Sequence, residues 1–331
     1  MADVAGQRQP QRDVGAGYGT AAIDSAADRA VGAGRVETSV AEREVGARSQ
    51  LQLAARRFIH HRMALVGLTI FVVLVLAAFI VPYFWTWSYS AITPAYATGP
   101  SASHPFGTDT IGHDLFAQVL AATQTSLKTA FIVTVIATGV GTIVGAVAGY
   151  YGGLADAALM RFTDLVLTVP LIAILLVLAN SLPQSNGNYF WVAIVVAAVL
   201  WTYLARLVRG TFLSLREHDY IVAARAIGST DARIIFRHMI PNAFGPIVVN
   251  ATLTVANAIL IESALSFLGL GIQPPAVSLG SLINSGQGAA TTLWWLFAFP
   301  SAVLVVIILA VNFVGDGLRD ALDPRQRRVR A

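Results

Sequence analysis

The sequence predicts an all-α integral membrane protein with six transmembrane helices and both termini on the inner side of the membrane. Of its 331 residues, 56% are hydrophobic and only 12% are charged, whereas soluble domains carry about 25% charged residues. Apolar runs long enough to cross a bilayer as helices recur along the chain. Arginine is confined to every second segment between these runs, which indicates the orientation.

The chain begins with two polar segments that precede the first apolar run. Residues 1–50 mix Ala, Gly, Gln and Arg with acidic residues and show no apolar period, which predicts a disordered cytoplasmic tail. Residues 51–62 (LQLAARRFIHHR) are basic and helix-prone, so we expect them to lie along the inner membrane surface. The first span is predicted at 63–84, because this run has no charge and ends in an aromatic belt. With the basic segment before it, this span forms a unit over 51–84.

A polar loop over 85–126 is expected outside the membrane, and a core of five further spans is expected over 127–315. These spans are predicted at 127–150, 162–182, 189–208, 247–268 and 293–314. Pro170 is expected to bend the span at 162–182. Residues 316–331 then form a cytoplasmic tail.

Glycine recurs at every fourth position in the span at 127–150, as Gly141, Gly145 and Gly149. Small residues at this spacing allow two helix backbones to approach closely. We therefore predict that this face packs against another helix.

The distribution of basic residues fixes the predicted topology. The outer segments 85–126, 183–188 and 269–292 contain no Arg, and Lys128, the chain's single Lys, lies near one of them. The opposite orientation would place all the Arg outside, against the positive-inside rule. The segment 209–246 is then cytoplasmic.

Two helical patterns, over 214–227 and 230–240, meet at Gly228 within this segment. Glycine just past a helix end adopts the left-handed conformation without steric penalty. Ser229 or Thr230 can cap the second helix, and Pro241 is expected to stop it because proline lacks an N–H. The sequence therefore predicts a helix–Gly–helix elbow.

The elbow, with YIVAARAIG followed by HMIPN, resembles the EAA loop of ABC-importer permeases. Arg237-His238 upstream of Ile-Pro-Asn resembles the dipeptide/oligopeptide/nickel branch, although Val222 replaces the name-giving Glu. The resemblance implies that the helix after Gly228 is a coupling helix, which seats in a cleft of an ATPase subunit. The residues that it implies for ATPase coupling are Ala223, Ala224, Arg225, Gly228, Ser229, Asp231, Arg233, Arg237 and Pro241.

The outer loop contains HPFGTDTIGHD, which resembles the HPxGTDxxGxD signature of the same branch. This resemblance fits contact with an extracytoplasmic binding protein through His104, Gly107, Asp109, Gly112 and Asp114. The alternative is a nickel or zinc site, because neutral imidazoles and carboxylates are ligands for these metals. Asp and Thr beside Gly also form ordinary turns, and we expect no metal site.

Asn257 and Glu262 lie in the span at 247–268. An ionisable residue inside a membrane is expensive and is a functional candidate, so both are candidates for a substrate pathway. The favoured alternative is a structural role, with Glu262 solvated near the outer end or paired with Lys128.

The sequence lacks the residues and motifs that several chemistries require. The chain has no Cys, which excludes disulfides, Cys-based metal sites and thiol catalysis. Leu127 precedes Lys128, so no Walker A motif is possible. We therefore predict that the chain is not an enzyme and holds no cofactor, and that ATP and Mg are bound by partner ATPase subunits.

The resemblance covers about residues 51–325 and implies a type I ABC-importer permease fold. It implies an assembly with a homologous permease, two ATPase domains and an extracytoplasmic binding protein, which imports peptides across the cytoplasmic membrane. Lipid contacts are expected, and nucleic acid is not. A nickel importer of the same branch is one alternative. A secondary transporter or channel is another, but the inverted repeats and buried coupling charges typical of secondary transporters are not evident.

Overall fold

The computed structural model describes residues 50–181 and 188–322. Residues 1–49 of the predicted tail at 1–50, the segment 182–187 and the end of the predicted C-terminal tail at 323–331 lie outside these residues. The chain divides into two units, Met1–Leu53 and Ala54–Ala331, and the description below concerns the second.

The described residues form helices joined by loops, with isolated β-bridges but no strand among them. In chain order the helices are α2 (Gln50–His60), α3 (Arg62–Ile80), the short 3₁₀ helix η1 (Val81–Tyr83), α4 (Leu115–Tyr151), α5 (Gly153–Thr168), α6 (Leu171–Ser181), α7 (Tyr189–Arg216), α8 (Asp219–Ala226), α9 (Asp231–Arg233), the π-helical segment η2 (Ile234–Met239), α10 (Ile240–Phe267), α11 (Leu279–Gln287) and α12 (Trp294–Leu322).

Five helices are long and apolar enough to cross a membrane, and a sixth span results if α5 and α6 are counted as one. The five are α3 with η1, α4, α7, the continuous helix Asp231–Phe267, and α12. The predicted six-span, all-α fold agrees with this count. The span predicted at 162–182 needs correction, because α5 begins at Gly153 and meets α6 at an angle of 91°. Pro170 lies in this break.

Three further boundaries differ from the prediction. The outer loop is shorter than 85–126, because α4 begins at Leu115. Asp114 caps this helix by accepting the N–H of Ala117 at 2.7 Å. At the other end of the chain, α12 continues through the first part of the predicted tail to Leu322. The short helix α11 lies where only an outer loop was expected.

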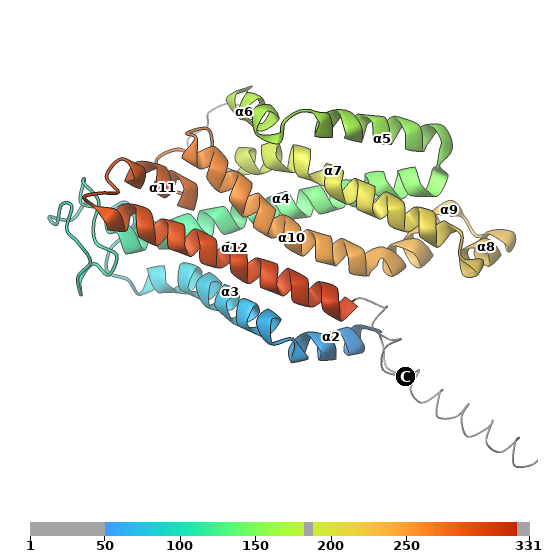
Figure 1. Cartoon of the computed structure of the whole chain (residues 1–331), viewed down its shortest axis with the longest axis horizontal. Coiled ribbons are helices and arrows are strands. Elements are labelled where there is room, and N and C mark those ends of the chain that lie inside the picture. The colour runs from blue at the N-terminus through green and yellow to red at the C-terminus, as the bar shows by residue number, and fades with distance from the viewer. Residues whose placement is uncertain (1–49, 182–187, 323–331) are drawn as a thin grey trace, which may run out of the picture. The chain divides into compact units, whose positions relative to one another are not determined.

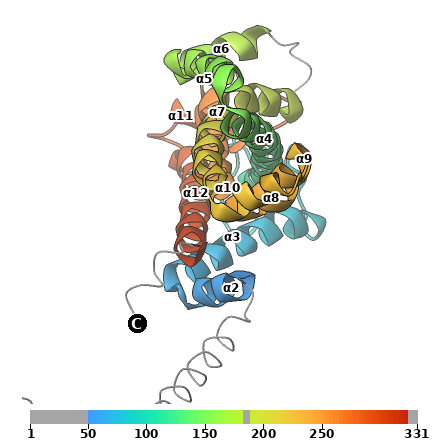
Figure 2. The same ribbon diagram turned by 90° about the vertical axis from the view of Figure 1, so that its right-hand side faces the viewer.

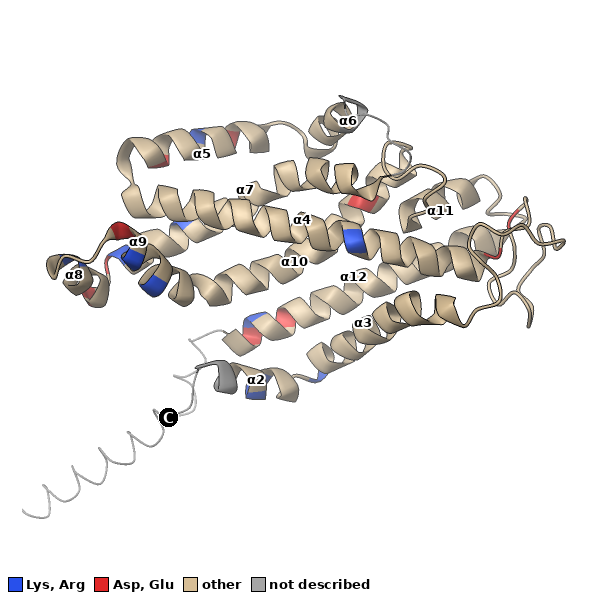
Figure 3. Cartoon of the chain, turned by 180° about the vertical axis from the view of Figure 1, so that it is seen from behind, with Lys and Arg blue, Asp and Glu red and all other residues tan. Residues whose placement is uncertain are grey.

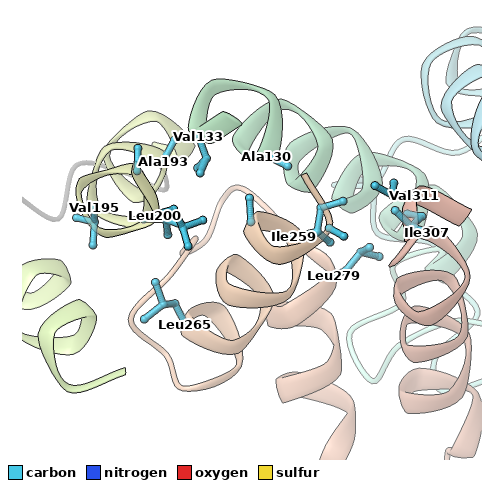
Figure 4. Close-up of a cluster of buried hydrophobic side chains, with 14 of the residues drawn as sticks. Ala130, Val133, Ala193, Val195, Leu200, Ile259, Leu265, Leu279, Ile307 and Val311 are labelled. Atoms are coloured by element: carbon cyan, nitrogen blue, oxygen red, sulfur yellow. The ribbon is translucent and has the colours of Figure 1, made fainter. Parts of the chain in front are cut away.

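The long helices α4, α7, α10 and α12 run side by side (Figure 1). Seen along the chain's long axis, α5 and α6 lie on one side of them and α3 on the other (Figure 2). Buried apolar side chains from α4, α7, α10, α11 and α12 form the main core (Figure 4). This burial stabilises the arrangement through close packing, since lipid tails are as apolar as the core itself.

The contact between α4 and α7 depends on the predicted glycine face. A Cβ added at Gly141 would lie 2.7 Å from the carbonyl oxygen of Trp201, and one at Gly145 would lie 2.5 Å from that of Ala205. Gly149 would meet Phe212 Cβ at 2.6 Å. The predicted close approach of helix backbones is therefore confirmed.

Two ion pairs attach α5 to α7. Arg206 Nη2 lies 2.6 Å from Asp164 Oδ1, and Arg209 forms a two-pronged pair with Asp156. They hold α5 on the flank of α7.

Candidate functional site

The segment around Gly228 forms the helix–Gly–helix elbow that the sequence predicts. Gly228 has a φ of +79°. Its N–H donates to the carbonyl of Arg225 at 3.0 Å, and the N–H of Ser229 donates to that of Ala224 at 3.1 Å, which is a Schellman cap. Thr230, rather than Ser229, caps α9 by accepting the N–H of Arg233 at 3.4 Å.

The arms of the elbow differ from the prediction. The helical pattern at 214–227 is divided, because α7 continues to Arg216 and α8 begins at Asp219. Pro241 does not stop the second helix, which runs from Asp231 to Phe267. The N–H of Ile240 donates to the carbonyl of Ile235 in the wide π-helical register. Pro241 falls in the first turn of α10, where proline is tolerated.

Most of the residues predicted for ATPase coupling are at the surface. Ala224 is buried and Ser229 is half-buried, whereas the others are exposed. Charged residues concentrate towards the end of the molecule that carries α8 and α9 (Figure 3). Among them lie exposed apolar side chains that sequence reasoning missed, namely Val222, Ile227 and Phe236. Ile227 is 83% exposed, and its signal in the sequence is an apolar residue directly before the capping glycine.

The residues of the predicted outer loop form two separate His–Asp pairs. His104 Nδ1 lies 2.7 Å from Asp114 Oδ2, and both side chains are buried. His113 Nδ1 lies 2.8 Å from Asp109 Oδ2. Within the described ranges no group of three or more potential metal-ligating side chains occurs.

Asp109 also organises the turn that contains Gly112. Its Oδ1 accepts the backbone N–H groups of Ile111, Gly112 and His113 at 2.8–2.9 Å. Gly107 and Gly112 both have positive φ, +79° and +99°. The signature residues therefore build a rigid turn at the start of α4.

A cavity of about 630 Å³ lies between this turn and the chain around α11. Asp109, His113 and Gln118 line one side, and Gln273 and Asn284 line the other. Of the five predicted contact residues, Asp109 lines this cavity.

The two pathway candidates lie in different environments. Asn257 is exposed on α10, whereas Glu262 is fully buried. The prediction that Glu262 is solvated or paired with Lys128 is wrong, because its carboxylate accepts hydrogen bonds from Ser126 at 2.8 Å and Ser266 at 2.7 Å. The Lys128 ammonium instead lies over the Phe79 ring, 5.6 Å from its centroid.

Comparison with known proteins places the chain in a family. Residues 141–328 match the family described as binding-protein-dependent transport system inner membrane component, and residues 49–103 match the N-terminal TM domain of oligopeptide transport permease C. The oligopeptide transport system permease protein OppC of Mycobacterium tuberculosis H37Rv is 41% identical over 85% of this chain and 97% of its own length. OppC of Bacillus subtilis is 36% identical over 83% and 90%, and a putative peptide permease protein of Brucella suis is 41% identical over 82% and 90%.

A solved structure of the MetNI methionine ABC transporter shares the fold. Its inward-facing form has a TM-score of 0.52 and 19% identity, and the match covers 63% of this chain and 98% of that one. Several apolar helices also mark the chain as a multi-pass inner-membrane protein. The chain belongs to the family of binding-protein-dependent transport system inner membrane components.

Proposed function

We propose that this chain is the permease subunit of an ATP-driven importer that moves peptides across the cytoplasmic membrane into the cell. The observation that carries the proposal is the identity of 36–41%, over at least 82% of the chain, to proteins named as oligopeptide or peptide permeases. The nickel alternative is less well supported, because His104 and His113 each engage a different carboxylate.

In this proposal the end of the molecule with α8 and α9 faces the cytoplasm, and both termini lie inside. The absence of Arg from the predicted outer segments supports this orientation. A homologous permease forms a heterodimer with this chain, and two ATPase domains bind the ATP and Mg. The elbow offers exposed Val222 and Ile227 beside Arg225 and Arg233, a mixed apolar and basic surface suited to a cleft in an ATPase subunit.

The proposed transport cycle is alternating access. ATP binding closes the ATPase dimer and displaces the elbow, and the continuous helix Asp231–Phe267 carries the displacement into the span. The pathway then opens outward to receive a peptide from the extracytoplasmic binding protein. The turn at Asp109 is the proposed contact for that protein, and Asn257 is the better pathway candidate because it is exposed.

The test is uptake of labelled peptides of graded length by cells that lack this chain and by complemented cells, with Ni²⁺ uptake measured in parallel. We expect complementation to restore the uptake of one length class of peptides. Restored Ni²⁺ uptake without any effect on peptides would replace the peptide assignment with the metal one.

A further inference from the structure

Tyr150, in the last turn of α4, contacts both arms of the elbow. Its hydroxyl donates to Asp231 Oδ1 at 2.6 Å, and Asp231 is the first residue of α9. The guanidinium of Arg225, in the last turn of α8, lies over its ring, 5.6 Å from the centroid. One side chain therefore bridges the residues on either side of Gly228.

Gly228 itself makes no close contact on the side where a Cβ would lie, because a Cβ placed there would meet no atom within 4 Å. The angle between α8 and α9 therefore depends on the cap hydrogen bonds and on contacts made farther along the two helices. A hydrogen bond to a carboxylate is directional and stronger than a neutral one, and a cation over an aromatic face is also oriented. Tyr150 supplies both constraints from outside the elbow.

The last turn of α4, which carries Tyr150, is tightly packed. Tyr150 is only 5% exposed, and it belongs to a buried cluster shared by α4, α7 and the elbow, with Phe212, Ile221, Ile234 and Met239 among its members. The adjacent Gly149 lies against Arg209 and Phe212 without room for a side chain. The last turn of α4 is thus held on α7, and the elbow is held on both.

We propose that Tyr150 is a positioning residue for energy coupling. It fixes the angle between the two arms of the elbow and transmits displacement of the elbow directly into α4, in addition to the covalent route through α10. This inference rests on the proposed function. It adds a residue outside the elbow, from a helix distant in sequence, to the coupling machinery.

The test uses the complete importer, reconstituted in vesicles with its partner permease, ATPase subunits and binding protein. Tyr150→Phe removes the hydroxyl but keeps the ring beneath Arg225. We expect peptides imported per ATP hydrolysed to fall by about threefold or more, with recovery and thermal midpoint of the complex unchanged. The matched control is Tyr151→Phe, because Tyr151 is 55% exposed and its hydroxyl has no hydrogen-bond partner among the described residues. This control should match the wild type.

A second variant changes the acceptor of the hydrogen bond between Tyr150 and Asp231. Asp231→Asn removes the charged acceptor, and we expect the double variant Tyr150→Phe/Asp231→Asn to be no worse than the more impaired single variant, because both disrupt one interaction. Additive effects would mean that Asp231 acts separately and would overturn the inference.

Two other outcomes would also overturn it. One is a wild-type ratio of import to hydrolysis in Tyr150→Phe. The other is a parallel loss of both activities or of the complex itself, which would reveal a purely structural role. A wild-type complex that imports no peptide would instead refute the proposed function, so the two failures are distinguishable.

Discussion

Glu262 is a buried carboxyl group whose hydrogen bonds join three parts of the chain. Ser126 Oγ donates to it while accepting the N–H of Leu279 at 3.4 Å. Ser266 Oγ donates to it while accepting the N–H of Ile272 at 3.0 Å. Each serine thus relays a backbone N–H to the carboxylate. The Ser126 relay attaches the start of α11 to α4 and α10, and the Ser266 relay attaches the segment after α10 to α10. Together these hydrogen bonds offset the cost of burying an acid.

Removing this carboxyl group should destabilise the protein. We expect Glu262→Ala to lower the free energy of unfolding by about 3 kcal/mol, because it leaves a cavity and unsatisfied hydroxyl groups. Glu262→Gln keeps the shape and one acceptor, so its cost should be about 1 kcal/mol. Thermal unfolding in detergent measures both, with Asn257→Ala as the exposed control on the same helix. An alanine variant as stable as the wild type would contradict this role.

At the scale of elements, the contact between α4 and α7 is set by glycines. Gly145→Ala places a Cβ only 2.5 Å from the carbonyl oxygen of Ala205, so the helices must separate. Overpacking of this kind costs about 1–3 kcal/mol. We expect a lower thermal midpoint and less protein in the membrane. Gly139→Ala is the control, because a Cβ there meets nothing within 4 Å and alanine favours the helix. Equal effects of both changes would contradict the packing model.

The apolar spans could be predicted from sequence because bilayer insertion depends on local composition. The start of α4 could not, since Gln118, Thr123 and Ser126 are polar yet buried. The partner of Ser126 is distant in the chain, because its hydroxyl donates to Glu262. The sequence predicts a stop at Pro241, because the π-helical turn before it, which lets the helix continue, has no simple sequence signal.

The candidate site divides in the same way. The geometry at Gly228 was predictable, because a glycine followed by Ser229 and Thr230 is a local capping signal. The contact of Tyr150 with Asp231 was not, because it joins elements far apart in sequence. Neighbouring residues determine the conformation of the turn at Gly228, whereas tertiary packing determines which distant side chains contact it.

At the scale of the whole molecule, the proposed orientation can be tested because the chain has no cysteine. Ser103→Cys and Ala226→Cys each place one thiol at an exposed position, in the outer loop and on the elbow. With a membrane-impermeant maleimide, we expect labelling of position 103 in intact cells and of position 226 only after permeabilisation. The cysteine-free chain is the control, and the reverse pattern would refute the orientation.

The continuous helix from Asp231 to Phe267 connects the elbow to the turns that carry Glu262. Its 37 residues extend about 55 Å at 1.5 Å per residue, well beyond the roughly 30 Å of a hydrocarbon core. A tilt of about 5° about the end nearer Glu262 corresponds to a displacement of about 5 Å at the elbow, close to one helical pitch. A small rotation of this helix therefore corresponds to a large displacement of the elbow.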